Sequence, residues 1–302
     1  MSKVMVVGSI ALDTVRTQTE EKKDILGGSC TYFAVAASHL APVEVVGAVG
    51  EDFPAKHVRM LKKHDIDLDG LQKKKGEKTF RWAGTYAADM NNRTTDDLQF
   101  GALGTFDPVL PEKYRKTRFV FLATDTPEHQ LKVLDQMKRK PVAVCDTIDH
   151  YIHNEPDGLK EVLGRVQGAI LNHDEVNLIT GHANTIAAAQ ALLKMGPKFV
   201  IAKKGEHGAI LAYRDRVYAV PAYPLAKVQD PTGAGDSFAG GFMGYLASQG
   251  NTKVETLVRA MAYGTATASF TCEAFSLDKL RKIKKKDIQK RVREFRRLTH
   301  IP

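Results

Sequence analysis

Residues 228–242 read Val-Gln-Asp-Pro-Thr-Gly-Ala-Gly-Asp-Ser-Phe-Ala-Gly-Gly-Phe, the most informative stretch of the chain. Glycine at two central positions lets the backbone approach a ligand closely, and the two phenylalanines that follow fall at helical spacing. This pattern predicts a helix that begins near Ala234. The first N–H groups of a helix have no partner within it, and the helix dipole favours negative charge there. Gly233, Ala234 and Gly235 therefore form a candidate anion site.

Asp236 lies in the first turn of this predicted helix, where the dipole favours its ionised form. Phosphoryl transfer to a hydroxyl group needs a carboxylate beside an anion site, because the base takes the alcohol proton while amides stabilise the transferring group. The alternative is a glycine-rich helix start in which Asp236 is an ordinary acid. The full pattern is more specific than a lone Gly-x-Gly, so we favour the catalytic interpretation. The chain has neither the P-loop pattern nor the protein kinase motifs.

Apolar runs of strand length alternate with helix-like segments along most of the chain. This alternation predicts a mostly parallel sheet covered by helices on both faces, with ligands bound at the carboxyl ends of the strands. Residues 75–104 are instead polar and without helical period, and we interpret them, with residues 14–25, as strands of a small flap. We find no internal repeat and no long linker, so residues 1–302 are expected to form a single domain. The expected strands include Val4–Val7, Val43–Val49, Phe119–Ala123, Val142–Asp146, Ala169–Asn172 and Phe199–Ala202.

The bulk composition is that of a folded protein with 302 residues, 43% apolar residues and a net charge of +9. No apolar run approaches the ~20 residues that span a bilayer, and the N-terminus resembles a first strand rather than a signal peptide. The three cysteines, Cys30, Cys145 and Cys272, are far apart, so we expect reduced thiols in a cytoplasmic protein. Basic runs occur at Lys73–Lys75 and between Lys279 and Lys290. Without a nucleic-acid-binding motif, we interpret them as solvated surface and expect no nucleic-acid partner.

Residues 230–242 resemble the C-terminal signature of the PfkB carbohydrate kinase family, within the ribokinase-like superfamily that also includes adenosine kinases. The resemblance extends over nearly the whole chain. It implies a three-layer α/β/α fold with a mostly parallel central sheet and a small β lid over the substrate. It also implies a kinase that phosphorylates an alcohol group of a small molecule. Five further family motifs appear in order, at Gly8–Asp13, Gly27-Gly28, Val46–Asp52, Asn172–Glu175 and Lys204–Gly208.

The resemblance implies roles for individual residues. Asp236 would be the catalytic base, with Gly233, Ala234 and Gly235 as the anion hole. Asn172 and Glu175 would organise Mg²⁺ and its waters near the phosphates of ATP, although both could simply start a helix. Nucleotide contacts are implied for Lys204, Gly205 and Gly208, and acceptor contacts for Asp13, Gly27, Gly28 and Tyr32. Asp230 and Thr232, with main-chain carbonyls of residues 269–276, are candidates for holding a monovalent cation such as K⁺.

The chain departs from the family pattern where many members contact a sugar. Many carry asparagine at the position of Ala11 and in the region of Tyr32 and Phe33. The acceptor is therefore left open between a sugar and a nucleoside, on which an aromatic side chain would stack. A sugar phosphate would need a basic residue near Asp13, and the sequence does not place one there. Arg93 could reach the phosphates of ATP when the lid closes, but we interpret it as a surface residue. The remaining alternatives are a silent sugar- or nucleotide-binding regulator and, from charge alone, a nucleic-acid binder. A homodimer through the lid is also left open.

Overall fold

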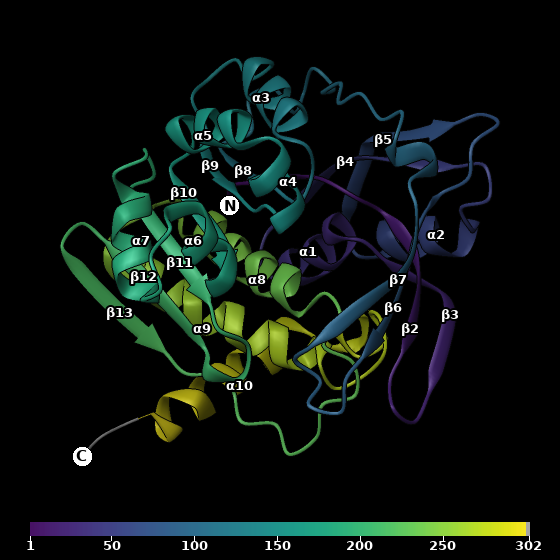
Figure 1. Cartoon of the computed structure of the whole chain (residues 1–302). Coiled ribbons are helices and arrows are strands. Elements are labelled where there is room, and N and C mark those ends of the chain that lie inside the picture. Colours follow the sequence, from purple (N-terminus) through teal and green to yellow (C-terminus); the bar gives the residue numbers. More distant parts are fainter. Residues whose placement is uncertain (300–302) are drawn as a thin grey trace.

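Within residues 1–299, the part of the chain that the computed structural model describes, nine strands form one main sheet (Figure 1). Six of its eight strand pairs are parallel. The order across the sheet is β13 (Arg216–Val220), β12 (Ala209–Tyr213), β11 (Phe199–Lys203), β10 (Gly168–Asn172), β9 (Val142–Cys145), β8 (Phe119–Leu122), β1 (Val4–Val7), β4 (Val43–Gly50) and β5 (Ile66–Lys74).

The central strands are parallel because their apolar residues are buried on both faces. Every residue of β1, β4 and β8 is buried. The two strands at one edge, β12 and β13, are antiparallel and form a hairpin. Its turn at Arg214 takes a positive φ of 56°.

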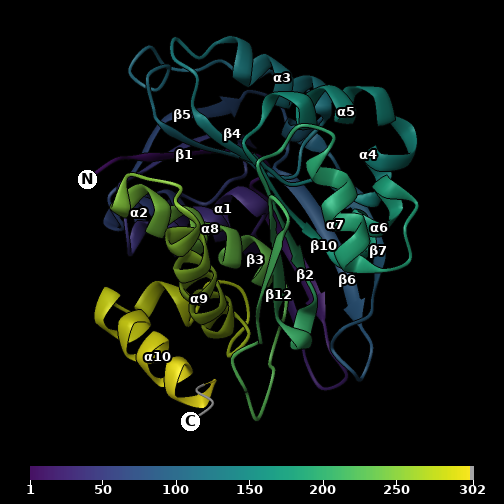
Figure 2. The ribbon, with the colours of Figure 1, turned by 90° about the vertical axis from the view of Figure 1, so that its left-hand side faces the viewer.

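Helices cover both faces of the main sheet, which gives three layers and two hydrophobic cores (Figure 2). In the first core, Phe33 stacks on Phe121 with ring centroids 4.6 Å apart, and Phe242 is fully buried. The helices of this face are α1 (Ser29–Ser38), α2 (Ala55–Lys63), α8 (Ala234–Gln249), α9 (Val254–Thr271) and α10 (Lys285–Leu298). The helices of the other face are α3 (Pro127–Asp135), α4 (Asp149–Asn154), α5 (Pro156–Arg165), α6 (His173–Thr180) and α7 (Thr185–Leu193).

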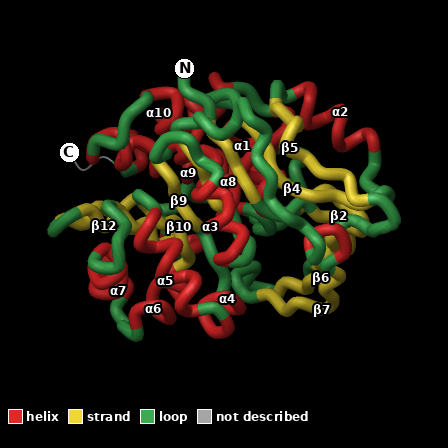
Figure 3. Tube along the Cα trace, turned by 90° about the horizontal axis from the view of Figure 1, so that it is seen from above, coloured by secondary structure: helices red, strands yellow, loops and turns green. Residues whose placement is uncertain are grey.

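A second sheet of four strands projects from the main body (Figure 3). We call it the small sheet; its order is β3 (Glu21–Gly27), β2 (Ala11–Arg16), β6 (Phe80–Tyr86) and β7 (Arg93–Gln99). Three of these strands lie within or largely within the segments expected to form the flap, whereas β2 begins earlier, at Ala11. Val15, Tyr86 and Phe275 form a separate apolar cluster beneath the sheet. Short 3-10 helices occupy Gly101–Leu103, Gly205–His207 and Leu280–Lys282.

The sequence predicted that no segment spans a membrane and that the cysteines are reduced. Among residues 1–299, no helix combines the length and the apolar character that crossing a bilayer would require. Cys30, Cys145 and Cys272 are free thiols, and the first two are buried.

Candidate active site

The start of α8 has the geometry of an anion site. Gly233 caps the helix in the left-handed conformation, with a φ of 74°, and no side chain caps the free amides. The N–H of Ala234 donates to the Pro231 carbonyl oxygen at 3.0 Å, so this predicted member of the anion hole is already satisfied. Within residues 1–299, the amides of Gly235 and Asp236 have no main-chain acceptor. Free N–H groups at a helix start bind anions.

Asp236 stands in the first turn of α8, beside these free amides. Burial raises the pKa of its carboxyl to about 6, and the Lys203 ammonium is the strongest influence in the opposite direction. The sequence argument from the helix dipole predicted that Asp236 is ionised. The carboxylate is still mostly ionised at pH 7, but burial outweighs the dipole and raises its pKa. A general base with a pKa near the working pH is well suited to proton transfer.

Lys203, at the end of β11, supplies the positive charge of the site. Its ammonium lies 3.1 Å from the Asp146 carboxylate, and both side chains are largely buried. A Cβ placed on Gly235 would lie 3.1 Å from Lys203 Nζ, so the ammonium touches the start of α8. Asp146, Glu175 and Asp236 all raise the pKa of Lys203. The sequence analysis missed Lys203 and chose its neighbour, Lys204.

Asn172 and Glu175 form a reciprocal cap at the start of α6. The Glu175 N–H donates to Asn172 Oδ1 at 2.8 Å, and the Asn172 N–H donates to Glu175 Oε2 at 2.7 Å. This geometry fits the plain helix-start interpretation. Glu175 is nonetheless buried, and burial together with the Asp146 charge raises the pKa of its carboxyl to about 8. The pair lies at the end of β10, between the strands that carry Asp146 and Lys203.

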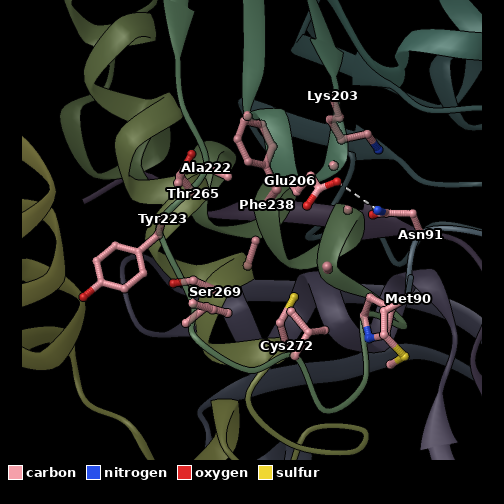
Figure 4. A pocket seen from close by; sticks show the side chains of 18 of the residues that line it. Met90, Asn91, Lys203, Glu206, Ala222, Tyr223, Phe238, Thr265, Ser269 and Cys272 are labelled. Carbon is pink, nitrogen blue, oxygen red and sulfur yellow. Dashed lines mark hydrogen bonds between the residues drawn. The ribbon is translucent and has the colours of Figure 1, made fainter. Parts of the chain in front are cut away.

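A cavity of about 450 Å³ opens beside the start of α8 (Figure 4). One side is polar, with Lys203 and the glycines of the turn after β11, and the other side is apolar, with Phe238 and Leu225. Gly205 and Gly208 both have a positive φ, and a Cβ on Gly208 would lie 2.1 Å from the Val220 carbonyl oxygen. The cavity can hold a molecule with an apolar ring at one end and an anionic tail at the helix start. Lys204 is not among the residues that line it.

Asp13 lies on β2 with a 4% exposed side chain, and its Oδ1 has no hydrogen-bond partner within residues 1–299. Burial and the charges of Asp230 and Asp236 raise the pKa of its carboxyl to about 8. Gly27 and Gly28 pack against this region, since a Cβ on Gly27 would lie 1.8 Å from Asp13 Oδ2. A buried, unpaired carboxyl group in such a position is suited to a hydroxyl-bearing ligand.

Tyr32 lies under the same site and not on its surface. Its ring packs on Gly233, where a Cβ would lie 2.2 Å from Tyr32 Cγ. The hydroxyl is buried and has no partner among the described residues, and burial raises its pKa well above the usual value. The neighbouring Phe33 belongs to the main core, so of the two aromatic residues only Tyr32 adjoins the site.

The small sheet closes over the site through two hydrogen bonds. The Thr232 hydroxyl donates to Tyr86 Oη at 3.0 Å. The Asn91 amide donates to Glu206 Oε1 at 3.1 Å, across the mouth of the cavity (Figure 4). The guanidinium of Arg93, on β7, lies 5.6 Å from the centre of the Trp82 ring and lowers the pKa of both Asp13 and Asp236. Although its side chain is exposed, Arg93 therefore faces the site.

Asp230 is fully buried in the loop before α8. Its Oδ1 accepts a hydrogen bond from the Thr232 N–H at 2.9 Å, and its Oδ2 accepts one from the Ser276 N–H at 3.2 Å. Gln229 N–H donates to the Cys272 carbonyl at 2.8 Å. These bonds bring the loop against the residue 269–276 segment, as the monovalent-cation prediction requires, while each carboxylate oxygen keeps a further lone pair.

Asp125, after β8, is a second residue that sequence reasoning missed. Its side chain is buried, Oδ1 pairs with His129 Nδ1 at 2.9 Å, and Oδ2 has no partner among residues 1–299. Asp125 and Asp236 both raise the pKa of the Cys30 thiol, so both carboxylates lie near it. The available signal was an acidic residue just beyond a predicted strand, where ligands bind in such sheets.

The arrangement combines a base, an anion site and a lysine beside a cavity that is partly apolar. It can bind an anionic tail at α8 and move a proton from a hydroxyl group onto Asp236. Among residues 1–299, no three histidine, cysteine or acidic residues are grouped to hold a metal ion. Asp146 and Glu175 supply two carboxylates, which fits an ion such as Mg²⁺ that keeps most of its waters.

Comparisons with known proteins show the family and the fold. The family model described as pfkB family carbohydrate kinase matches residues 1–281. A cytidine kinase of Thermococcus kodakarensis is 30% identical over 80% of this chain and 88% of its own. A nucleoside kinase of Methanocaldococcus jannaschii is 26% identical over 91% of each chain. The solved structure of a putative ribokinase II from E. coli, in complex with ATP and Mg²⁺, superposes with a TM-score of 0.82 at 20% identity, covering 97% of this chain and all of the other.

Proposed function

The chain belongs to the pfkB family of carbohydrate kinases, and we propose that it transfers the terminal phosphoryl group of ATP to a hydroxyl group of a sugar or nucleoside, with Asp236 as the general base. The observation that carries this proposal is the position of Asp236 beside the free amides of α8 and close to Lys203. The acceptor hydroxyl gives its proton to the Asp236 carboxylate. Its oxygen bonds to the γ-phosphorus while the bond to the bridging oxygen breaks and ADP leaves.

The cavity beside α8 is the nucleotide site of this proposal. Its apolar side receives the base and ribose, and its polar side receives the phosphates next to Lys203 and Gly235. The amides of Gly235 and Asp236 and the Lys203 ammonium stabilise charge on the transferring group. Asp146 and Glu175 hold the waters of Mg²⁺, which neutralises phosphate charge when bound. Lys203 takes the role that the family resemblance assigned to Lys204.

The acceptor binds between Asp13 and Asp236, with Tyr32 beneath the site. Asp13 Oδ1 is buried there and lacks a partner among residues 1–299, and a hydroxyl group of the acceptor satisfies it. Asp13 with a pKa of about 8 donates one hydrogen bond as the neutral acid or accepts one as the carboxylate. The charges that act on Asp13 are Asp230, Asp236 and the single cation Arg93, which disfavours a sugar phosphate as the acceptor. An intact base and anion site also disfavour a silent regulator.

The small sheet is the lid of this kinase, and residues 1–299 form a single domain into which the lid is inserted. The Tyr86–Thr232 and Asn91–Glu206 hydrogen bonds hold it closed. A closed lid excludes water, which would otherwise accept the phosphoryl group. Two finer assignments complete the proposal. Asp230 and the residue 269–276 carbonyls hold a monovalent cation, and the exposed edge strand β7 offers a surface for pairing two chains.

The test is a coupled assay for ADP release with a panel of sugars, nucleosides and sugar phosphates. For the best acceptor, Asp236→Asn should lower kcat by about 10²- to 10⁴-fold, the usual contribution of a general base, while ATP binding is kept. Asp215→Asn, in the exposed β12–β13 turn, is the matched control and should match the wild type. If Asp236→Asn turns over like the wild type, the assignment of the base is wrong. ATP binding without turnover of any acceptor would favour the regulator.

A further inference from the structure

The positive charge of this protein is concentrated at one end of the chain. Residues 279–299 contain 11 lysines and arginines against two acidic residues, while the whole chain has 44 against 35. The rest of the chain therefore has 33 basic and 33 acidic residues, and the entire net charge of +9 comes from residues 279–299. The match to the family model ends at residue 281, so most of the segment, including the whole of α10, lies outside the residues that this model matches.

Helix α10 separates its apolar and cationic residues onto opposite faces. Ile288, Val292 and Phe295 are buried and belong to the main hydrophobic core. The opposite side, here called the outer face, consists of four exposed cations at spacings of four, three and four residues, which form one stripe along a helix. They are Lys286, Lys290, Arg293 and Arg297.

The outer face is not neutralised by the part of the chain that the structure describes. None of its four cations forms an ion pair with any of residues 1–299. Arg291, which is not part of the outer face, does have a partner, Glu273 at 2.6 Å. Like charges four residues apart destabilise a helix by about 0.2–0.5 kcal/mol per pair, and Lys286 lies near the unfavourable positive end of the dipole. The pattern therefore lowers the stability of the helix, and no ion pair with any of residues 1–299 compensates for it.

We propose that the outer face of α10 binds the phosphate backbone of nucleic acid without reading its sequence. Four cations over about 16 Å of helix match a line of phosphates, which one strand of a duplex presents every ~3.4 Å along its axis. This differs from the expectation drawn from the sequence, because the structure shows the basic residues aligned on one face. It does not depend on the proposed kinase function.

Two other partners fit the outer face less well. A helix that binds a membrane surface buries an apolar face in the lipid, but the apolar face of α10 already packs against the protein. Protein interfaces have a core enriched in aromatic and apolar residues, and the outer face has none. In both ribbon views α10 lies at the edge of the molecule, packed on α9 (Figures 1 and 2), so a long polyanion can reach it.

The experiment measures fluorescence anisotropy of a labelled 20-base-pair duplex, in two unrelated sequences, with the full chain. Neutralising about four phosphates predicts a slope of log Kd against log salt near 3.6, so binding weakens about a hundredfold between 50 and 200 mM salt. Both sequences should bind equally. The variant K286Q/K290Q/R293Q/R297Q should bind at least tenfold more weakly at 50 mM salt. The matched control, K62Q/K63Q/K73Q/K75Q, replaces four exposed lysines in the part of the chain before residue 279, whose charges balance. It should bind the duplex like the wild type.

Kinase turnover should be the same for all three proteins, because no residue of the outer face lines the cavity. The outer-face variant should unfold at the same temperature as the wild type or slightly higher, because it removes like-charge repulsion along α10. Three outcomes would overturn the proposal. Absence of duplex binding at 50 mM salt is the first. An equal loss in both quadruple variants would show that total charge and not the outer face is responsible. The third is binding to phosphatidylserine-containing vesicles without binding to the duplex, which would identify a membrane surface as the partner.

Discussion

The Lys203 ammonium lies 3.1 Å from the Asp146 carboxylate, and both side chains are largely buried at the carboxyl end of the main sheet. The two residues come from β11 and the end of β9, with β10 and its Asn172–Glu175 cap between them. Asp146 keeps the ammonium protonated, and the ammonium in turn lowers the pKa of Asp236. One ion pair thus connects the proposed nucleotide side of the site to Asp236, the proposed base.

Lys203→Met should remove both of these effects. We expect kcat/KM for ATP to fall by about 10²- to 10³-fold, the range for loss of a preorganised group that stabilises transition-state charge. Lys204→Met is the matched control, because the adjacent lysine does not line the cavity, and its kcat/KM should stay within about threefold of the wild type. Steady-state kinetics on both variants tests this assignment. A larger loss of kcat/KM in Lys204→Met than in Lys203→Met would show that Lys204, the residue predicted from the sequence, contacts the nucleotide.

The pH dependence should show the same connection. Asp236 must be ionised to accept a proton, and burial raises its pKa to about 6. With saturating acceptor, kcat/KM for ATP should therefore be level near pH 7.5 and fall about tenfold per pH unit below pH 6. Because Lys203 lowers this pKa, Lys203→Met should move the acidic limb to higher pH. If the acidic limb of the pH profile does not move in Lys203→Met, Lys203 and Asp236 do not interact.

Much of the fold could be predicted from the sequence because most strands of the main sheet are continuous apolar runs. β1, β4, β8, β9, β10 and β11 all overlap the strands expected. β5 was missed, since this edge strand, Ile66–Lys74, is only partly buried and lacks a clear hydrophobic pattern.

The features of the candidate site that depend on local sequence could be predicted. The features that depend on tertiary packing were missed. The α8 start and Gly233 follow from helix and glycine chemistry. Lys203 and Lys204 are adjacent and chemically identical in the sequence, and only the strand's side-chain alternation places Lys203 at the cavity. The raised pKa of Asp236 comes from burial, a tertiary property that the helix-dipole argument does not contain.

Asp13 should make the folded protein less stable as the pH rises. The unfolded chain ionises this group near its ordinary pKa of 3.8, whereas the folded protein retains the proton up to about pH 8. Between these values the folded state binds more protons, so the free energy of unfolding falls with rising pH. Asp13→Asn should therefore raise the Tm relative to the wild type more at pH 8 than at pH 5, while acceptor kcat/KM falls. Asp215→Asn is the control, and an equal change in Tm at both pH values would contradict the burial argument.

Gly233→Ala should damage both stability and activity. The residue has a φ of 74°, and an added Cβ would lie 2.2 Å from Tyr32 Cγ. The left-handed conformation alone costs about 1–2 kcal/mol for a residue with a Cβ, so we expect a loss of at least that size in the free energy of unfolding. Gly164→Ala is the control, because nothing lies within 4 Å of its added Cβ and its φ is negative. Denaturant titration should show Gly164→Ala unchanged or slightly more stable.

The Tyr86–Thr232 hydrogen bond connects the small sheet directly to the loop before α8, at 3.0 Å. Tyr86→Phe and Thr232→Val each remove this bond with little change in shape. We expect each to raise KM for the acceptor about five- to tenfold, since a buried hydrogen bond contributes about 1 kcal/mol, and to increase ATP hydrolysis without acceptor as water enters.

The double variant makes this prediction specific to the bond. If both effects come from one hydrogen bond, Tyr86→Phe/Thr232→Val should lose no more than either single variant. Trp82→Phe is the control within the same sheet, because it removes a hydrogen bond to Thr95 that does not reach the main body. Losses that add fully in the double variant would show that Tyr86 and Thr232 act separately, and that the sheet is held closed by other contacts, such as the Asn91–Glu206 bond.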